Sequence, residues 1–91
     1  MADKILILDD EEMTVHLLTL LLEKRGFEVI KALTAEEGLR KAYRHQPDLV
    51  LLDIMMPDMD GWDVCKRLRE MSDMPIIFIT AKDDTKDVVR G

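Results

Sequence analysis

The sequence contains few of the features that mark secreted, membrane-bound or nucleic-acid-binding proteins. Cys65 is the single cysteine among 91 residues, which excludes an intrachain disulfide and favours a reducing compartment. The 13 Lys and Arg residues of the chain are outnumbered by 19 Asp and Glu residues. The resulting net charge of −6 disfavours direct binding to nucleic acid or to an anionic membrane. No apolar run is long enough for a signal peptide or a membrane span. These absences predict a cytoplasmic protein.

Aromatic residues are also scarce, at 4% of the chain, whereas 47% of the residues are hydrophobic. The core is therefore expected to be aliphatic. A chain of this length corresponds to one domain, spanning 1–91, and can bury a core with little surplus.

Three short apolar runs each end at an oxygen-bearing side chain: 4–8 before Asp9 and Asp10, 48–52 before Asp53, and 75–79 before Thr80. Unbroken aliphatic runs are typical of parallel strands that are covered on both faces by helices. Because the carboxyl ends of such strands meet at one edge of the sheet, we expect three carboxylates and a hydroxyl to share a pocket. Clustered carboxylates repel one another unless a cation or proton lies among them, and hard oxygen ligands favour Mg²⁺.

Helical patterns fill the segments between the runs. Helices are predicted at about 13–25, from the capping pair Thr34 and Glu37 to His45, and at 62–70, with a further strand at 27–31. A fourth helix is expected after Asp83 or Asp84. The apolar residues at helical spacing are Met13, Leu17, Leu20 and Leu21 in the first helix, and the expected inner faces of the next two are Ala35, Leu39, Ala42 and Tyr43, then Val64, Cys65, Leu68 and Met71. Right-handed crossovers with one reversal predict the strand order 2-1-3-4.

Three segments in this order, Ile7–Glu11, Leu51–Gly61 and Ile79–Ala81, resemble the motifs of the receiver domain of two-component response regulators, of the chemotaxis-regulator type. The resemblance extends over the whole chain. It implies an α/β, flavodoxin-like, doubly wound parallel sheet, here ending before the family's fifth strand and fifth helix.

The resemblance also implies a role for each site residue. Asp53 would accept a phosphoryl group from the phosphohistidine of a sensor histidine kinase or a phosphotransfer protein. Asp10 would bind Mg²⁺ directly, Asp9 mainly through water, and the Met55 backbone carbonyl would supply another ligand. Thr80 would hydrogen-bond the phosphoryl group. Such a domain is a phosphoacceptor that switches partner interactions, rather than a turnover enzyme.

The chain departs from the family pattern at its end. The family's fifth strand carries a lysine that has no counterpart here, since Lys82 lies in a different loop. Without that strand the segment 75–80 is expected to form an open edge, and the leucine-rich first helix is expected to lose a neighbour. We therefore expect self-association through strand 4 and the face of helix 1, as a twofold dimer.

Two other functions fit parts of the sequence. The missing lysine is compatible with a non-phosphorylated interaction module on the receiver scaffold. A haloacid-dehalogenase-like phosphatase also uses an aspartyl phosphate and Mg²⁺, but requires Asp-x-Asp after the first strand, where Glu11 follows Asp9 and Asp10. The acidic pair could instead merely cap the first helix. His16 is expected to be a surface side chain, or one with its hydrogen bonds satisfied, rather than a phosphorelay histidine.

Overall fold

The computed structural model describes residues 3–54, 56 and 60–79 of the chain. Strands and helices alternate along it: β1 (Lys4–Leu8), α1 (Glu12–Lys24), β2 (Glu28–Ala32), α2 (Ala35–His45), β3 (Leu49–Asp53), α3 (Gly61–Met71) and β4 (Ile76–Ile79). The helix expected after Asp83 or Asp84 falls outside the described residues, as does Lys82.

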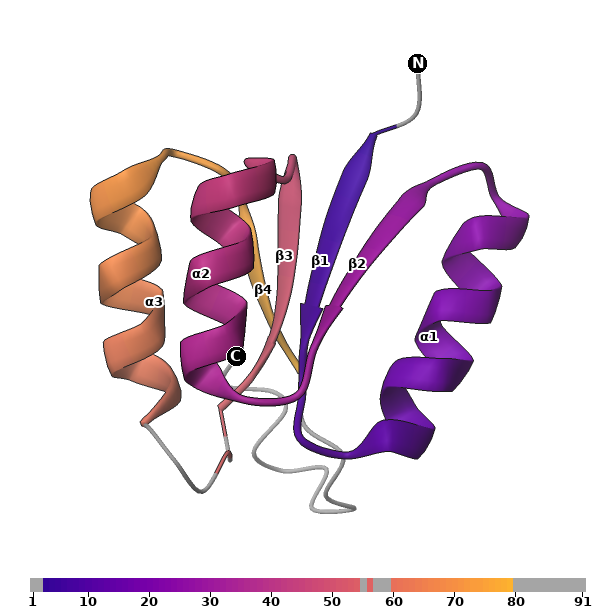
Figure 1. The fold of residues 1–91 in the computed structure, drawn as a ribbon, viewed down its shortest axis with the longest axis horizontal. Helices are drawn as coiled ribbons and strands as arrows, with labels where there is room; N and C mark the ends of the chain where they lie inside the picture. Colours follow the sequence, from indigo (N-terminus) through magenta and orange to yellow (C-terminus); the bar gives the residue numbers. More distant parts are fainter. Residues whose placement is uncertain (1–2, 55, 57–59, 80–91) are drawn as a thin grey trace.

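The strands form one parallel sheet in the order β2-β1-β3-β4. Helix α1 covers one face, and α2 and α3 cover the other (Figure 1). The strand order and the doubly wound architecture predicted from the sequence are thus confirmed. None of the helices in the described part of the chain is both long and apolar enough to cross a membrane.

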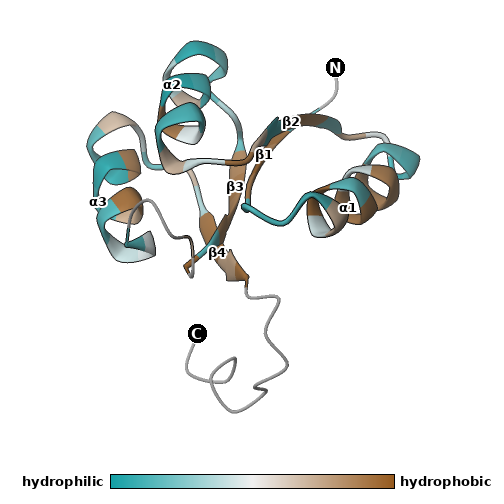
Figure 2. Cartoon of the chain, turned by 60° about the horizontal axis from the view of Figure 1, so that its bottom comes forward, coloured by the Kyte–Doolittle hydropathy of each residue, from teal (hydrophilic) through white to brown (hydrophobic). Residues whose placement is uncertain are grey.

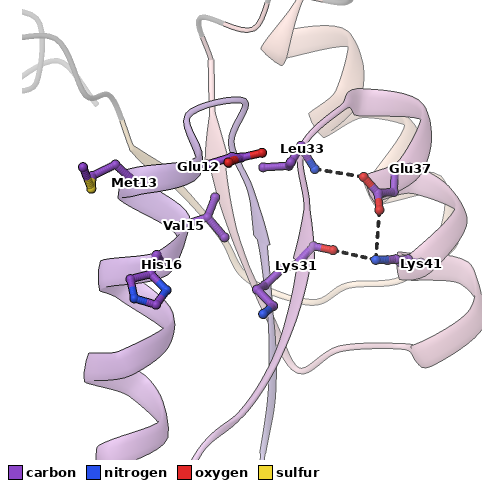
Figure 3. Close-up of a pocket in the computed structure, with 8 residues that line it drawn as sticks. All are labelled: Glu12, Met13, Val15, His16, Lys31, Leu33, Glu37 and Lys41. Atoms are coloured by element: carbon purple, nitrogen blue, oxygen red, sulfur yellow. Dashed lines mark hydrogen bonds and ion pairs between the residues drawn. The ribbon is translucent and has the colours of Figure 1, made fainter.

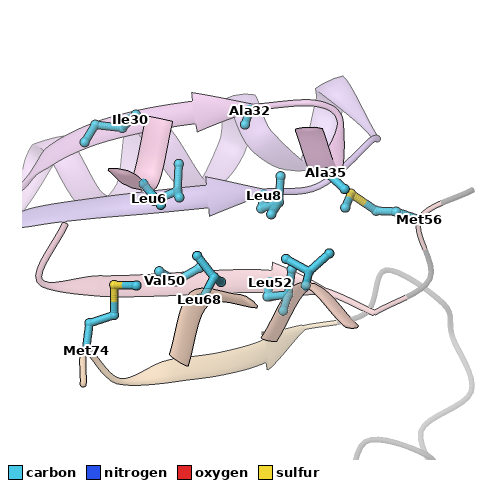
Figure 4. Packing of buried hydrophobic residues seen from close by; sticks show 12 residues of the cluster. Leu6, Leu8, Ile30, Ala32, Ala35, Val50, Leu52, Met56, Leu68 and Met74 are labelled. Carbon is cyan, nitrogen blue, oxygen red and sulfur yellow. The ribbon is translucent and has the colours of Figure 1, made fainter. Parts of the chain in front are cut away.

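The interior strand β1 shows why its sequence has no polar alternation. Leu6 and Leu8 belong to the core layer beneath α2 and α3, which Figure 4 shows, whereas Ile5 and Ile7 pack in the layer beneath α1. All four side chains are at most 2% exposed, so both faces of β1 exclude water. Burial on both faces is what an unbroken aliphatic run indicates.

Helix α2 begins where the capping pair predicted it. The Glu37 N–H donates to Thr34 Oγ1 at 3.1 Å, which satisfies one of the free amides of the first turn. Gly38 lets this helix approach β1 closely, because a Cβ atom at this position would lie 2.3 Å from Leu8 Cδ1. The helix ends at Gln46, which adopts a left-handed conformation with φ of 49°.

The buried faces of the helices agree only in part with the spacing of the apolar residues. On α1 the residues at the predicted spacing are all more than half exposed: Met13, Leu17, Leu20 and Leu21. The side packed on the sheet instead carries Val15, Leu18, Thr19 and Leu22. Apolar residues occupy several sides of this helix (Figure 2), so their spacing alone does not select the buried one.

Two residues on the other layer also differ from expectation. Tyr43 on α2 is 74% exposed and Met71 on α3 is 40% exposed, because each lies near the end of its helix and outside the core cluster. Cys65 is half-buried against that cluster, as expected for a core cysteine. The histidine at position 16 is exposed, in agreement with a surface position.

Candidate functional site

Three aspartates meet at the carboxyl ends of the two central strands. Leu8 of β1 lies beside Leu52 of β3, so Asp9 and Asp53, the next residues, come together. With Asp10 they form a cluster in which one carboxylate oxygen from each residue lies within 4.8 Å of the other two. The acidic cluster predicted from the sequence is therefore present among the described residues.

The three carboxylates differ in their access to water. Asp9 is fully buried and Asp53 is 4% exposed, whereas Asp10 is exposed. The Glu11 N–H donates to Asp9 Oδ1 at 3.0 Å. The other oxygen, Asp9 Oδ2, is buried and accepts no hydrogen bond from any group in the described part of the chain. A buried carboxylate oxygen without a donor is costly, so this position favours a proton or a cation.

The electrostatics of Asp9 support the same conclusion. Burial raises the pKa of this carboxyl from 3.8 to about 6, while the Glu11 amide acts in the opposite direction. The charge of Asp53, a hydrogen bond between the Asp9 and Asp53 side chains, and then the charge of Asp10 add to the rise. Near neutral pH, the fold thus keeps the three carboxylates close together although their negative charges repel one another. A divalent cation among the oxygens would relieve this repulsion.

Helix capping does not account for the cluster. The N-cap of α1 is Glu11, whose side chain makes no capping hydrogen bond but instead accepts from Thr14 Oγ1. Asp9 satisfies one backbone amide through a single oxygen. That contact leaves the second oxygen of Asp9 and the proximity of Asp53 unexplained.

The start of α3 is packed tightly against the end of β3. A Cβ atom on Gly61 would lie 2.4 Å from Ile54 Cα, so only glycine fits there without a shift of the backbone. Asp60 caps the helix by accepting the Trp62 N–H at 2.9 Å. From the sequence, Asp60 is expected only in a loop, although aspartate is a typical N-cap residue.

An aromatic pair connects this region to β4. The rings of Trp62 and Phe78 have centroids 4.6 Å apart and planes inclined at 50°. Phe78 lies one residue before Ile79, which pairs with Asp53 across the sheet. The single tryptophan of the chain therefore packs against β4, the neighbour of the strand that carries Asp53. Two predicted site residues, Met55 and Thr80, fall outside the described residues.

Comparison with known proteins is consistent with this arrangement. The family model described as "Response regulator receiver domain" matches residues 5–91. The alkaline phosphatase synthesis transcriptional regulatory protein PhoP of Bacillus subtilis (strain 168) is 50% identical over 92 residues, and the match covers all of this chain and 38% of PhoP.

Solved structures agree. A CheY-like response regulator receiver domain protein from Methanospirillum hungatei JF-1 superimposes with a TM-score of 0.87 at 32% identity, covering 98% of this chain and 72% of that one. A two-component response regulator from Clostridium difficile gives a TM-score of 0.85 at 31% identity, covering 96% and 72% of the two chains. The chain belongs to the family of response regulator receiver domains, whose role is that of a phosphoacceptor in signalling.

Proposed function

We propose that Asp53 accepts a phosphoryl group from a phosphohistidine on a sensor histidine kinase or a phosphotransfer protein. The observation that carries the proposal is the position of Asp53 at the end of the central strand β3, inside the acidic cluster and 4% exposed. Asp53 is favoured over Asp9 as the phosphoryl acceptor, because Asp9 is fully buried and one of its oxygens accepts the Glu11 amide hydrogen. A cytoplasmic location is part of the same proposal, supported by the single cysteine.

The proposed cofactor is Mg²⁺, held by Asp9, Asp10, Asp53 and the Met55 carbonyl. The fit rests on the donor set, which is hard oxygen throughout, and on the buried Asp9 Oδ2 that has no donor among the described residues. When bound, the ion neutralises charge on the carboxylates and on the incoming phosphoryl oxygens and aligns them.

The role of each protein group follows from the chemistry. An Asp53 oxygen forms the new P–O bond while the P–N bond to the donor histidine breaks, and the imidazole nitrogen leaves with the bonding electron pair. The Glu11 amide fixes the Asp9 carboxylate through Oδ1, and the buried Oδ2, which has no donor among the described residues, is available to a cation. Thr80 would donate its hydroxyl hydrogen to the transferred phosphoryl group.

Mass spectrometry after incubation with acetyl phosphate and Mg²⁺ tests the assignment. We expect one added phosphoryl group, absent in Asp53→Asn and retained in Asp73→Asn, which alters an exposed aspartate after α3. Omission of Mg²⁺ should suppress the addition. A phosphoryl group on another residue, or one still added to Asp53→Asn, would refute the proposal.

Self-association through β4 and the face of α1 is a second proposal, supported by the exposed apolar residues there: Met13, Leu17, Leu20, Leu21 and Ile77. Sedimentation over a wide concentration range tests it. We expect the sedimentation coefficient to rise with concentration, and the rise to be lost in Leu17→Gln/Leu21→Gln. The same coefficient at all concentrations would contradict it.

A further inference from the structure

The outer edge of β2 has an unusual set of partners. Among the described residues β2 pairs with β1 alone, so one side of the strand is an edge. The Ala32 carbonyl accepts the Asp9 N–H at 3.1 Å, and the Glu28 N–H donates to the Asp3 carbonyl at 2.9 Å. The backbone N–H and C=O groups of residues 28, 30 and 32 therefore point toward β1. The alternation of a strand then directs those of Val29, Lys31 and Leu33 outward. An outward row of backbone groups is a template for another strand.

Two side chains from α2 occupy part of this row. Lys41 Nζ donates to the Lys31 carbonyl at 2.7 Å, and the Leu33 N–H donates to Glu37 Oε1 at 3.0 Å. The two side chains are joined by a 3.0 Å ion pair (Figure 3). We call Glu37 and Lys41 the edge clamp. It fills one acceptor and one donor of the edge, as a neighbouring strand would.

The Glu37 side chain hydrogen-bonds to the edge of β2 rather than to the N-cap residue of its own helix. In a capping box its side chain would accept from the N–H of the N-cap residue, Thr34. Here it accepts from Leu33, one residue earlier and at the edge. Its pKa is lowered, first by that amide and then by Lys41, so the carboxylate remains charged and paired at neutral pH.

We propose that the edge clamp keeps β2 closed to strand addition by a second copy of this chain. A twofold antiparallel pair centred on Lys31 would bring the outward backbone groups of both copies into register, with Val29 of each copy opposite Leu33 of the other. Both central hydrogen bonds of that pair need the Lys31 carbonyl, which the clamp occupies.

The edge borders an open groove. A groove of about 680 Å³ lies between α1 and this edge, lined by Glu12, Met13, Val15, His16, Lys31, Leu33, Glu37 and Lys41 (Figure 3). The part of the edge at Lys31 and Leu33 is therefore not filled by side chains of α1. The charge of Lys31 is a second obstacle, because the two lysines would lie opposite each other in the pair.

Disulfide cross-linking measures access to the edge. In a Cys65→Ser background, Lys31→Cys places one thiol in each copy at the twofold centre, where the Cα separation of a hydrogen-bonded pair suits a disulfide. We expect cross-linking to be about tenfold faster when Glu37→Ala/Lys41→Ala is added, since hydrogen-bonding groups of the edge are released. The matched control is Glu36→Ala/Arg40→Ala, which removes the same charges from exposed positions of the same helix.

Hydrogen exchange of the Leu33 amide tests the clamp separately. In Glu37→Ala, which removes the acceptor of the Leu33 N–H, we expect faster exchange at Leu33, with helical circular dichroism retained. If the double variant fails to fold, Lys41→Met carries the cross-linking test. Equal cross-linking rates with and without the clamp would overturn the proposal, as would unchanged exchange at Leu33.

Discussion

Replacing Asp9 by asparagine removes the buried charge at the centre of the acidic cluster with little change in shape. The amide oxygen can still accept the Glu11 N–H, as Asp9 Oδ1 does at 3.0 Å. The amide nitrogen takes the place of Oδ2 and supplies a donor to the cluster, where Asp53 lies nearby. We expect Asp9→Asn to stabilise the metal-free protein.

The size of the effect follows from the raised pKa of Asp9, about 6 in the folded protein against an ordinary 3.8. Between these values the folded state binds more protons than the unfolded state, so the metal-free parent loses stability as the pH rises through this window. A shift of about two pKa units corresponds to about 3 kcal/mol at most. Asp9→Asn should therefore be more stable by about 1–3 kcal/mol at pH 8, and the difference should disappear below about pH 4.

Urea unfolding in EDTA, followed by circular dichroism at several pH values, measures this difference. Mg²⁺ should raise the stability of the parent and have little effect on Asp9→Asn, because the variant lacks a charged ligand. Asp73→Asn, at an exposed position, serves as the control. If the free energy of unfolding of Asp9→Asn exceeded that of the parent equally at all pH values, or did not exceed it at pH 8, the buried charge of Asp9 would not destabilise the metal-free protein.

Three further predictions concern the elements that build the site. Gly61→Ala should destabilise the domain by about 1–3 kcal/mol in urea unfolding, because the added Cβ meets the backbone at the end of β3; a cost near zero would contradict the close packing. Thr34→Ala should cost about 1 kcal/mol through the lost cap at the Glu37 amide, whereas Thr34→Ser should restore most of it; equal stability of the two variants would refute the cap. Mg²⁺ should change the fluorescence of Trp62 in the parent and not in Asp10→Asn, and an identical titration curve for both would remove Asp10 from the metal site.

Much of the site could be predicted from the sequence because it depends on strand ends. Aliphatic runs identified the strands, and the rules for parallel sheets placed Asp9 and Asp53 at adjacent strand ends. The structure confirms the order of the strands and the cluster with Asp10. The roles assigned to Met55 and Thr80 remain predictions.

What the sequence by itself determined is therefore the class of fold and the identity of the clustered acids, since both follow from local patterns repeated along the chain. Only the tertiary structure decided which side of α1 is buried, because its apolar residues occupy several sides and the sheet selects one. It likewise decided that Glu37 reaches Leu33, and that Asp9 is buried deeply enough to raise its pKa. Burial depends on contacts between segments far apart in the chain, and the partner of Glu37 depends on how α2 meets the end of β2. The spacing of residues within one segment predicts neither.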